Sequence, residues 1–290
     1  MTLSGFVANG IAEALNAAAE ERFLETGHPK DLTLFWVAGT GNKDGSHADH
    51  YAHEGMVKKV IGGHFNFVPK ICEMLSENKI EGYNVPQGAI AQMLRDNAAR
   101  KVGTISHVGI GTFADPRNGG GRLSEKTKED IVKIIELEGQ EQLFYPRIPL
   151  DVAFIRGTYA DELGNITLEK EMAPLDATSQ AMAVHNNGGL VVVQVERVVK
   201  AGHLDPKLVK IPGIYVDAVV ECPADDPKQS QSINCTYDPA YAGNTQVPVS
   251  SLEPKKLDAK KIIGRRASNG IKEKTLLLTL VLVFLNGYLL

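Results

Sequence analysis

Residues 32–45 read LTLFWVAGTGNKDG and join a short, mostly apolar run to a glycine-rich loop. An apolar run of this length that ends in glycines predicts a buried strand followed by a functional turn. Val152–Ile155 and Leu190–Val195 are further apolar runs without alternation. Unbroken runs are typical of central parallel strands, which helices cover on both faces. The sequence therefore predicts a parallel sheet built on these runs.

Helix and strand signals alternate along the first hundred residues. The first expected helix has apolar residues at Ile11, Leu15 and Ala18 and ends at Gly27 and Pro29. The other expected elements are strands at 57–61 and 82–85 and helices at 69–78 and 89–99. This alternation predicts an α/β fold with an open, mostly parallel sheet and flanking helices.

The composition is that of a globular protein. The chain has 290 residues, enough for one large or two smaller domains, and a net charge of −4. A nucleic-acid partner would favour a basic stripe and is not expected. Cys72, Cys222 and Cys235 fit no zinc spacing. An odd number of cysteines without a secretion signal predicts reduced thiols in the cytoplasm.

The C-terminal region differs in composition from the rest. Residues 275–285, TLLLTLVLVFL, are almost all apolar. A membrane-spanning helix needs about 20 such residues, so we expect a buried strand or an out-of-frame tail rather than a membrane anchor. We divide the chain into a domain at 1–220, a linker or surface excursion at 221–262, and a last segment at 263–290 that holds the apolar tail.

The glycine loop allows two interpretations. A loop that follows a strand can cradle phosphate, but G-x-G-x-x-x-G is not the dinucleotide pattern G-x-G-x-x-G. No acidic residue ends a second strand about 20 positions on, as ribose recognition requires. The other interpretation, slightly favoured by the pattern, is a tight turn that needs positive φ angles. A nicotinamide-dependent oxidoreductase is therefore a remote alternative.

Three histidines, His47, His50 and His53, lie near Asp49, Glu54 and His64. Steps of three residues drift around a helix axis, so H-x-x-H-x-x-H fits one helix face poorly. The spacing is neither H-E-x-x-H nor that of a zinc finger. We therefore expect a polar segment that leads into an element rather than a metal site.

Two other loops carry candidate polar groups. Gln87, in Pro86-Gln87-Gly88, is expected at the carboxyl end of a strand, where open α/β sheets bind ligands and where its amide can donate to an oxyanion. Taken alone, a glutamine in a turn is more often a surface residue. Residues 115–118, DPRN, either hold an anion or close a long loop.

Six segments follow one another in a fixed order along the chain: VAGTGNKDG, AHEGMVKKVIGGH, YNVPQG, GTISHVGIGTFADPRNGGG, VAFIRGTYADELGNITLEKE and VERVVKAGHLDPKLVKIPGIYVDAVV. Together they resemble the N-terminal, α-type half of family I CoA-transferases. The resemblance is nearest to the fused acetate/propionate CoA-transferases, which act on short-chain acyl-CoAs, and covers roughly residues 4–268. It is specific at family level because the motifs are long and ordered.

The resemblance implies two similar α/β domains, from two halves of one chain or from α and β subunits. In this family a glutamate carboxylate attacks the acyl-CoA to give an anhydride. The CoA thiolate then forms a glutamyl-CoA thioester, and a second carboxylic acid takes the CoA. CoA thioesters and carboxylates such as acetate are then the substrates, and no metal or redox cofactor is expected.

The resemblance also implies roles for particular residues. Gln87 would help to stabilise the tetrahedral oxyanion. The reacting centre would be lined by Gly39, Thr40, Gly41 and Asn42, and the acyl pocket would be bordered by Gly111, Thr112, Phe113 and Asp115.

Three departures from the family pattern shape the expectations. The family's glutamate belongs to the second half, so no residue of this chain is named as the nucleophile. Relatives carry a strand before the turn at residues 4–7, and here Met1 almost abuts that turn, so we expect this strand to be missing. After residues 260–268 relatives continue into the second half, whereas this chain turns to an unrelated apolar tail, which suggests a frameshift or premature stop.

Two functions from different classes follow. The first is an α-type CoA-transferase chain that works with a β-type half or subunit and forms a homo-oligomer. The second is a truncated, catalytically inactive remnant that binds ligand without turnover. Either one leaves an apolar face uncovered, so we expect self-association.

Overall fold

The computed structural model describes residues 1–251, 253, 254 and 256–269. The chain divides into two units, Met1–Gly243 and Asn244–Leu290. The first unit extends to Gly243, beyond the domain boundary expected at residue 220. In the second unit, helix α5 (Ala259–Ser268) is N-capped by Asp258, whose carboxylate accepts a hydrogen bond from the Lys261 backbone N–H at 2.7 Å. The apolar tail at 275–285 lies outside the described residues.

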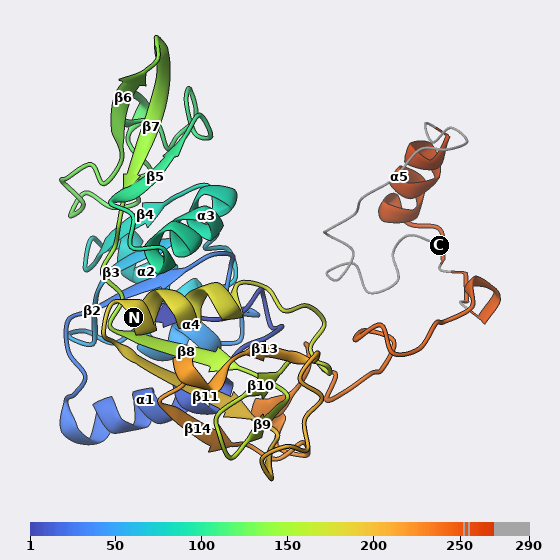
Figure 1. The fold of residues 1–290 in the computed structure, drawn as a ribbon. Coiled ribbons are helices and arrows are strands. Elements are labelled where there is room, and N and C mark those ends of the chain that lie inside the picture. The colour runs from blue at the N-terminus through green and yellow to red at the C-terminus, as the bar shows by residue number, and fades with distance from the viewer. Residues whose placement is uncertain (252, 255, 270–290) are drawn as a thin grey trace. The chain divides into compact units, whose positions relative to one another are not determined.

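A seven-stranded sheet forms the centre of the first unit, and all of its strands are parallel (Figure 1). The predicted fold class is confirmed. From one edge to the other the strands are β14 (Ala218–Glu221), β11 (Leu190–Val195), β8 (Val152–Arg156), β1 (Thr2–Leu3), β2 (Leu32–Trp36), β3 (Val57–Gly62) and β4 (Glu81–Asn84).

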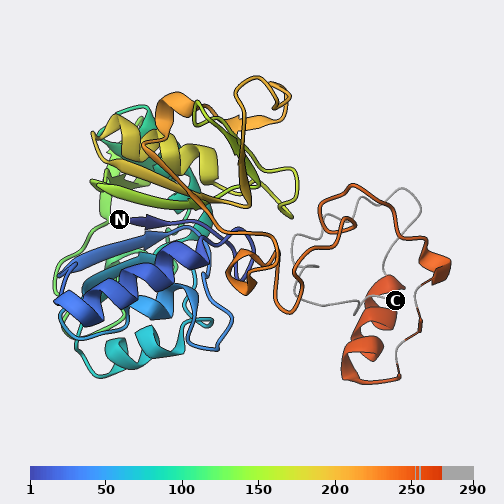
Figure 2. The same cartoon turned by 90° about the horizontal axis from the view of Figure 1, so that it is seen from below.

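Helices cover both faces of this sheet (Figures 1 and 2). One face packs on α1 (Glu13–Thr26), the short helix η1 (His47–Tyr51) and α2 (Pro69–Ser76), with a core that includes Leu34, Trp36 and Ile71. The other face packs on α3 (Gln87–Ala98) and α4 (Ala177–Asn186), with a core that includes Ile90 and Val193. Burial on both faces explains why these strands read as unbroken apolar runs.

The strand expected to be missing is present over two residues. Thr2 of β1 pairs with Phe35 on one side and Ala153 on the other, and the Ser4 N–H donates to the Phe154 carbonyl at 3.0 Å. Two residues give no periodic signal, so the sequence could not predict this strand. The strand order runs from β1 through β2 and β3 to β4 on one side, and through β8 and β11 to β14 on the other. The order in which the chain adds strands to the sheet therefore reverses between β1 and β8, although the strands stay parallel, and open α/β sheets bind ligands at such a point.

The other helices and strands agree with the expected elements to within a few residues. Gly27, at φ 67°, ends α1 through a hydrogen bond from its N–H to the Phe23 carbonyl at 2.7 Å. The helix expected at 89–99 begins instead at Gln87, because Pro86 provides the entry to its first turn.

Two antiparallel or mixed sheets were not predicted. A three-stranded sheet in the order β5 (Gly103–Ser106), β7 (Gln140–Pro146) and β6 (Lys133–Leu137) projects beyond α3 (Figure 1). A four-stranded sheet has the order β12 (Arg197–Val199), β9 (Tyr159–Asp161), β10 (Ile166–Thr167) and β13 (Val209–Ile211). The strands of the four-stranded sheet have only two or three residues. Those of the three-stranded sheet are partly exposed and contain polar residues, so neither sheet shows the apolar runs of the central sheet.

Candidate functional site

The glycine loop begins directly beyond β2, at the carboxyl edge of the sheet. Gly41 packs so closely that a Cβ there would lie 2.2 Å from the Phe67 carbonyl oxygen. A Cβ on Gly39 would lie 2.8 Å from the His64 ring. Only Gly45 of the three loop glycines has a positive φ, 88°. The expected need for positive φ is therefore wrong at Gly39 and Gly41, where the reason for glycine is close packing.

The first part of this loop is fixed by the turn that follows β1. Val7 pairs in parallel with Thr40, and the Gly41 N–H donates to the Val7 carbonyl at 3.0 Å. Thr40 is fully buried as a result. Further along, the Asn42 side chain accepts a hydrogen bond from the Asp44 N–H at 3.1 Å. The loop is therefore held both by pairing with the turn after β1 and by a hydrogen bond within the loop itself.

Gln87 is the first residue of α3 and is exposed. Its side chain makes no hydrogen bond to any described residue and is free to donate or accept. Gly63, just beyond β3, lets the neighbouring segments approach: a Cβ there would lie 2.2 Å from the Val37 carbonyl oxygen and 3.1 Å from the Gln87 Cβ. The ends of β2, β3 and β4 thus bring Gln87 and the glycine loop to the same edge of the sheet.

The segment from Gly111 to Asp115 lies beside the end of β4. The Gly121 N–H donates to the Phe113 carbonyl at 2.8 Å, and the Asn84 N–H donates to the Gly121 carbonyl at 2.7 Å. The Phe113 side chain is 53% exposed, and the Thr112 hydroxyl donates to the Gly109 carbonyl at 2.7 Å. This segment is therefore an ordered loop at the same edge as Gln87.

Asp115 organises that loop. Its carboxylate accepts hydrogen bonds from the Arg117 guanidinium, at 2.7 Å to Nη2, and from the Gly111 N–H at 2.9 Å. The side-chain hydrogen bonds from Arg117 hold the pKa of Asp115 well below its usual range. Arg117 also reaches Glu141 on β7. Of the two interpretations of residues 115–118, the structure supports loop closure.

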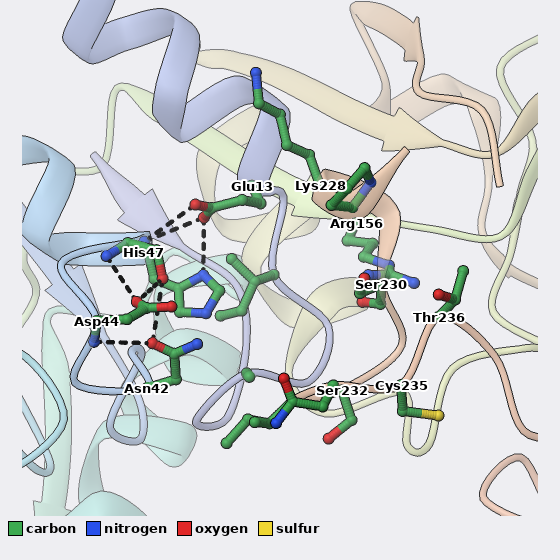
Figure 3. A pocket seen from close by; sticks show the side chains of 16 residues that line it. Glu13, Asn42, Asp44, His47, Arg156, Lys228, Ser230, Ser232, Cys235 and Thr236 are labelled. Carbon is green, nitrogen blue, oxygen red and sulfur yellow. Dashed lines mark hydrogen bonds and ion pairs between the residues drawn. The ribbon is translucent and has the colours of Figure 1, made fainter. Parts of the chain in front are cut away.

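A cavity of about 610 Å³ lies at the point where the strand order reverses (Figure 3). Residues from the loops after β1 and β2, from the end of β8 and from the segment after β14 line it. Asn42 is the only predicted site residue among them. The polar lining residues are Glu13, Asn42, Asp44, Ser46, His47, Arg156, Lys228, Ser230, Ser232, Asn234, Cys235 and Thr236.

Sequence reasoning missed most of this lining. Residues 227–236 fall in the stretch interpreted as a linker or excursion, but they fold back over the sheet edge. The Gln194 side chain of β11 donates to the Lys228 carbonyl at 2.9 Å, and the Gln231 side chain donates to the Lys170 carbonyl at 2.6 Å. Arg156 could have been identified as a candidate site residue, because it directly follows the apolar run at 152–155 and so lies at the carboxyl end of a predicted strand.

The three histidines form a ladder with two glutamates of α1. Glu13 contacts the Nδ1 of His47 at 2.8 Å and the Nε2 of His50 at 2.7 Å. Glu20 contacts the other ring nitrogen of His50, and also the Nε2 of His53 at 2.6 Å. Among the described residues, no group of three or more His, Cys, Asp or Glu side chains could hold a metal ion. The histidines instead join η1 to α1.

His50 lies between the two carboxylates of this ladder. Both of its ring nitrogens face carboxylate oxygens, so both must be protonated. Burial alone would lower the pKa of His50, but hydrogen bonds to Glu13 and Glu20 outweigh it and raise that pKa. Burial would raise the pKa of Glu13, yet hydrogen bonds from His47 and His50 outweigh it and lower that pKa to about 2.

These shifts predict a stability maximum in mildly acidic solution. The contribution of His50 is complete below pH 6.5 and is lost as pH rises through its raised pKa. That of Glu13 is complete above pH 4.5 and is lost as pH falls toward 2. We expect the melting temperature to fall as the pH is raised above 6.5, and to fall less steeply in His50→Gln. Equal slopes in thermal unfolding of the two proteins would contradict this prediction.

Comparison with known proteins identifies the family. The coenzyme A transferase family model matches residues 1–222. The chain belongs to the coenzyme A transferase family. It is 41% identical over 261 residues to the acetate CoA-transferase YdiF of Escherichia coli K12, which is 89% of this chain and 48% of that one. It is 38% identical over 266 residues to the caffeate CoA-transferase of Acetobacterium woodii, which is 92% of this chain and 51% of that one.

The structural comparison agrees. The acyl-CoA transferase YdiF of Escherichia coli O157:H7, in its apoenzyme crystal structure, matches with a TM-score of 0.84 and 39% identity over 92% of this chain and 50% of that one. The chain thus spans about half the length of YdiF and of the caffeate CoA-transferase. Other family members are separate subunits, such as the acetoacetyl-CoA:acetate/butyrate CoA transferase alpha subunit of Clostridium acetobutylicum. Among the described residues, no helix is both long and apolar enough to cross a membrane.

Proposed function

We propose that the chain is the α-type half of a CoA-transferase that moves CoA between a short-chain acyl-CoA and a carboxylic acid such as acetate. The observation that carries this proposal is the meeting of Gln87 and the glycine loop at one edge of the parallel sheet, in a chain that is 41% identical to an acetate CoA-transferase. An exposed amide without a described partner suits a group that must donate to a developing oxyanion.

The chemistry requires a nucleophile from elsewhere. We propose that a glutamate of a β-type half or subunit attacks the acyl carbon, and that the CoA thiolate leaves and then returns to form a glutamyl-CoA thioester. Return of the thiolate to the glutamyl carbonyl releases the first acid as its carboxylate. The second carboxylate then attacks the thioester and expels the thiolate, which gives a second anhydride. Attack of the thiolate on the acyl carbon of that anhydride forms the new acyl-CoA and restores the glutamate. Gln87 and the loop at Gly39–Asn42 would stabilise the negative oxygen in each step, while Gly111–Asp115 would border the acyl chain.

The experiment is a reconstitution. The chain is assayed for exchange of CoA between acetyl-CoA and labelled propionate, alone and together with the separately expressed C-terminal half of YdiF. We expect exchange only in the mixture, because the chain supplies the oxyanion-stabilising edge and the added half supplies the carboxylate. Exchange by the chain alone would show that its own residues supply the nucleophile. Absence of exchange in a mixture that forms a complex would favour the alternative, a ligand-binding chain without turnover.

A further inference from the structure

Arg156 is an incompletely paired cation in the interior. It is the last residue of β8 and only 5% exposed. Its Nε donates to the Glu171 carboxylate at 3.1 Å, and its Nη1 donates to the Ser230 carbonyl. No described residue accepts a hydrogen bond from its Nη2. Of the five N–H donors of a guanidinium, three therefore have no hydrogen-bond acceptor among the described residues.

The unpaired part of the guanidinium borders open space. Arg156 and Thr236 both line the cavity of about 610 Å³ and also a neighbouring cavity of about 320 Å³. In Figure 3 the guanidinium end of Arg156 lies beside Ser230, on the side of the cavity where Thr236 is placed. The two acidic residues that line the larger cavity are already engaged, Glu13 by His47 and His50, and Asp44 by Ser46. In the larger cavity, Arg156 therefore keeps N–H donors that the acidic lining residues do not use, while in the neighbouring cavity one carboxylate oxygen of Glu171 also has no partner.

We propose that this end of the cavity is a binding site for a short-chain carboxylate, with Arg156 Nη2 and the Thr236 hydroxyl as donors to the carboxylate oxygens. A guanidinium matches a planar carboxylate in geometry. Glu171 already balances one charge on Arg156, so a monoanion is favoured over a dianion such as phosphate. Ala8, Ile11 and Ile233 line the same cavity, so an alkyl chain finds apolar contacts there.

The choice of a short-chain acid as the ligand rests on the proposed function, but binding of that acid can be tested without CoA. The ¹⁵N-labelled chain is titrated with sodium propionate at constant ionic strength, and the arginine Nε–H resonances are followed by NMR. Arg156 is assigned from the resonance that Arg156→Lys removes. We expect a saturable shift of that resonance, a much smaller one with phosphate, and none with propionamide, which has the same shape without the charge.

Three variants test the geometry. Arg156→Lys keeps a positive charge for Glu171 but loses the planar guanidinium with its paired N–H donors. Propionate should therefore bind at least tenfold more weakly, as measured by calorimetry. Thr236→Val removes an exposed hydroxyl and should weaken binding about two- to fivefold. Lys210→Met is the control: this exposed lysine lines neither cavity, so its loss should leave propionate binding unchanged.

Several results would overturn the site. The first is an absence of saturation with wild type up to about 50 mM propionate. The others are equal affinity of wild type and Thr236→Val for propionate, and binding of propionamide as tight as that of propionate. If Arg156→Lys does not fold, calorimetric titration of wild type and Thr236→Val with propionate and propionamide still decides. Loss of the site with CoA exchange intact in the reconstituted mixture would leave the proposed function standing.

Discussion

Replacing Gln87 by alanine is expected to lower the kcat of CoA exchange in the reconstituted enzyme about 100- to 1000-fold, the usual cost of losing one oxyanion donor. Stability should not change, because Gln87 is exposed, is the first residue of α3, and makes no side-chain hydrogen bond to any described residue. Alanine is also a good helix former. The measurement is steady-state exchange between acetyl-CoA and propionate, with thermal unfolding of the same samples.

Gln92 provides the matched control on the same helix. It is also exposed, and its amide is hydrogen-bonded to Asp96 at 3.2 Å rather than facing the sheet edge. Gln92→Ala should leave kcat unchanged. A kcat for Gln87→Ala within threefold of wild type would exclude an oxyanion role for this residue. A large rise in KM with kcat unchanged would assign Gln87 to substrate binding instead.

Replacing Glu13 by alanine is expected to reduce the free energy of unfolding by about 3 kcal/mol. This value follows from the lowering of its pKa from 4.5 to about 2, at about 1.4 kcal/mol for each pKa unit. The loss has two parts, because Glu13 binds both the ring and the backbone N–H of His47 and also the ring of His50. Urea unfolding at pH 6 measures it, and the melting temperature should fall by roughly 6–12 °C.

Glu21→Ala tests whether the effect is specific. Glu21 is exposed on the same helix and has no resolved interaction with the histidines, so its removal should change stability by no more than about 0.5 kcal/mol. A similar small change in Glu13→Ala would mean that the ladder contributes nothing measurable. Because Glu13 and His47 also line the cavity, a destabilised ladder should in addition raise amide hydrogen exchange in residues 39–47.

The candidate site could be predicted only in part. Gln87 and Gly39–Asn42 were named from a resemblance, and the structure places them at one strand edge, although their catalytic roles stay predictions. Arg156 and residues 227–236 were not named, since a segment rich in Pro, Ser, Gln and Asp has no periodicity. What holds that segment in place is a set of long-range side-chain bonds, such as the one from Gln194 to the Lys228 carbonyl. Such bonds join residues far apart in sequence and leave no local pattern.

The sequence by itself determined the α/β class, the buried parallel strands at 32–36, 152–156 and 190–195, and the glycine loop that follows the first of them. It could do so because a strand that is buried on both faces has apolar residues at successive positions, and such a run can be recognised in the sequence. Only the tertiary structure decided that β1 separates the two halves of the sheet, that the histidines pair with Glu13 and Glu20, and that Arg156 faces a cavity. These features depend on which strand ends meet in space, and that is set by the strand order rather than by any local stretch of sequence.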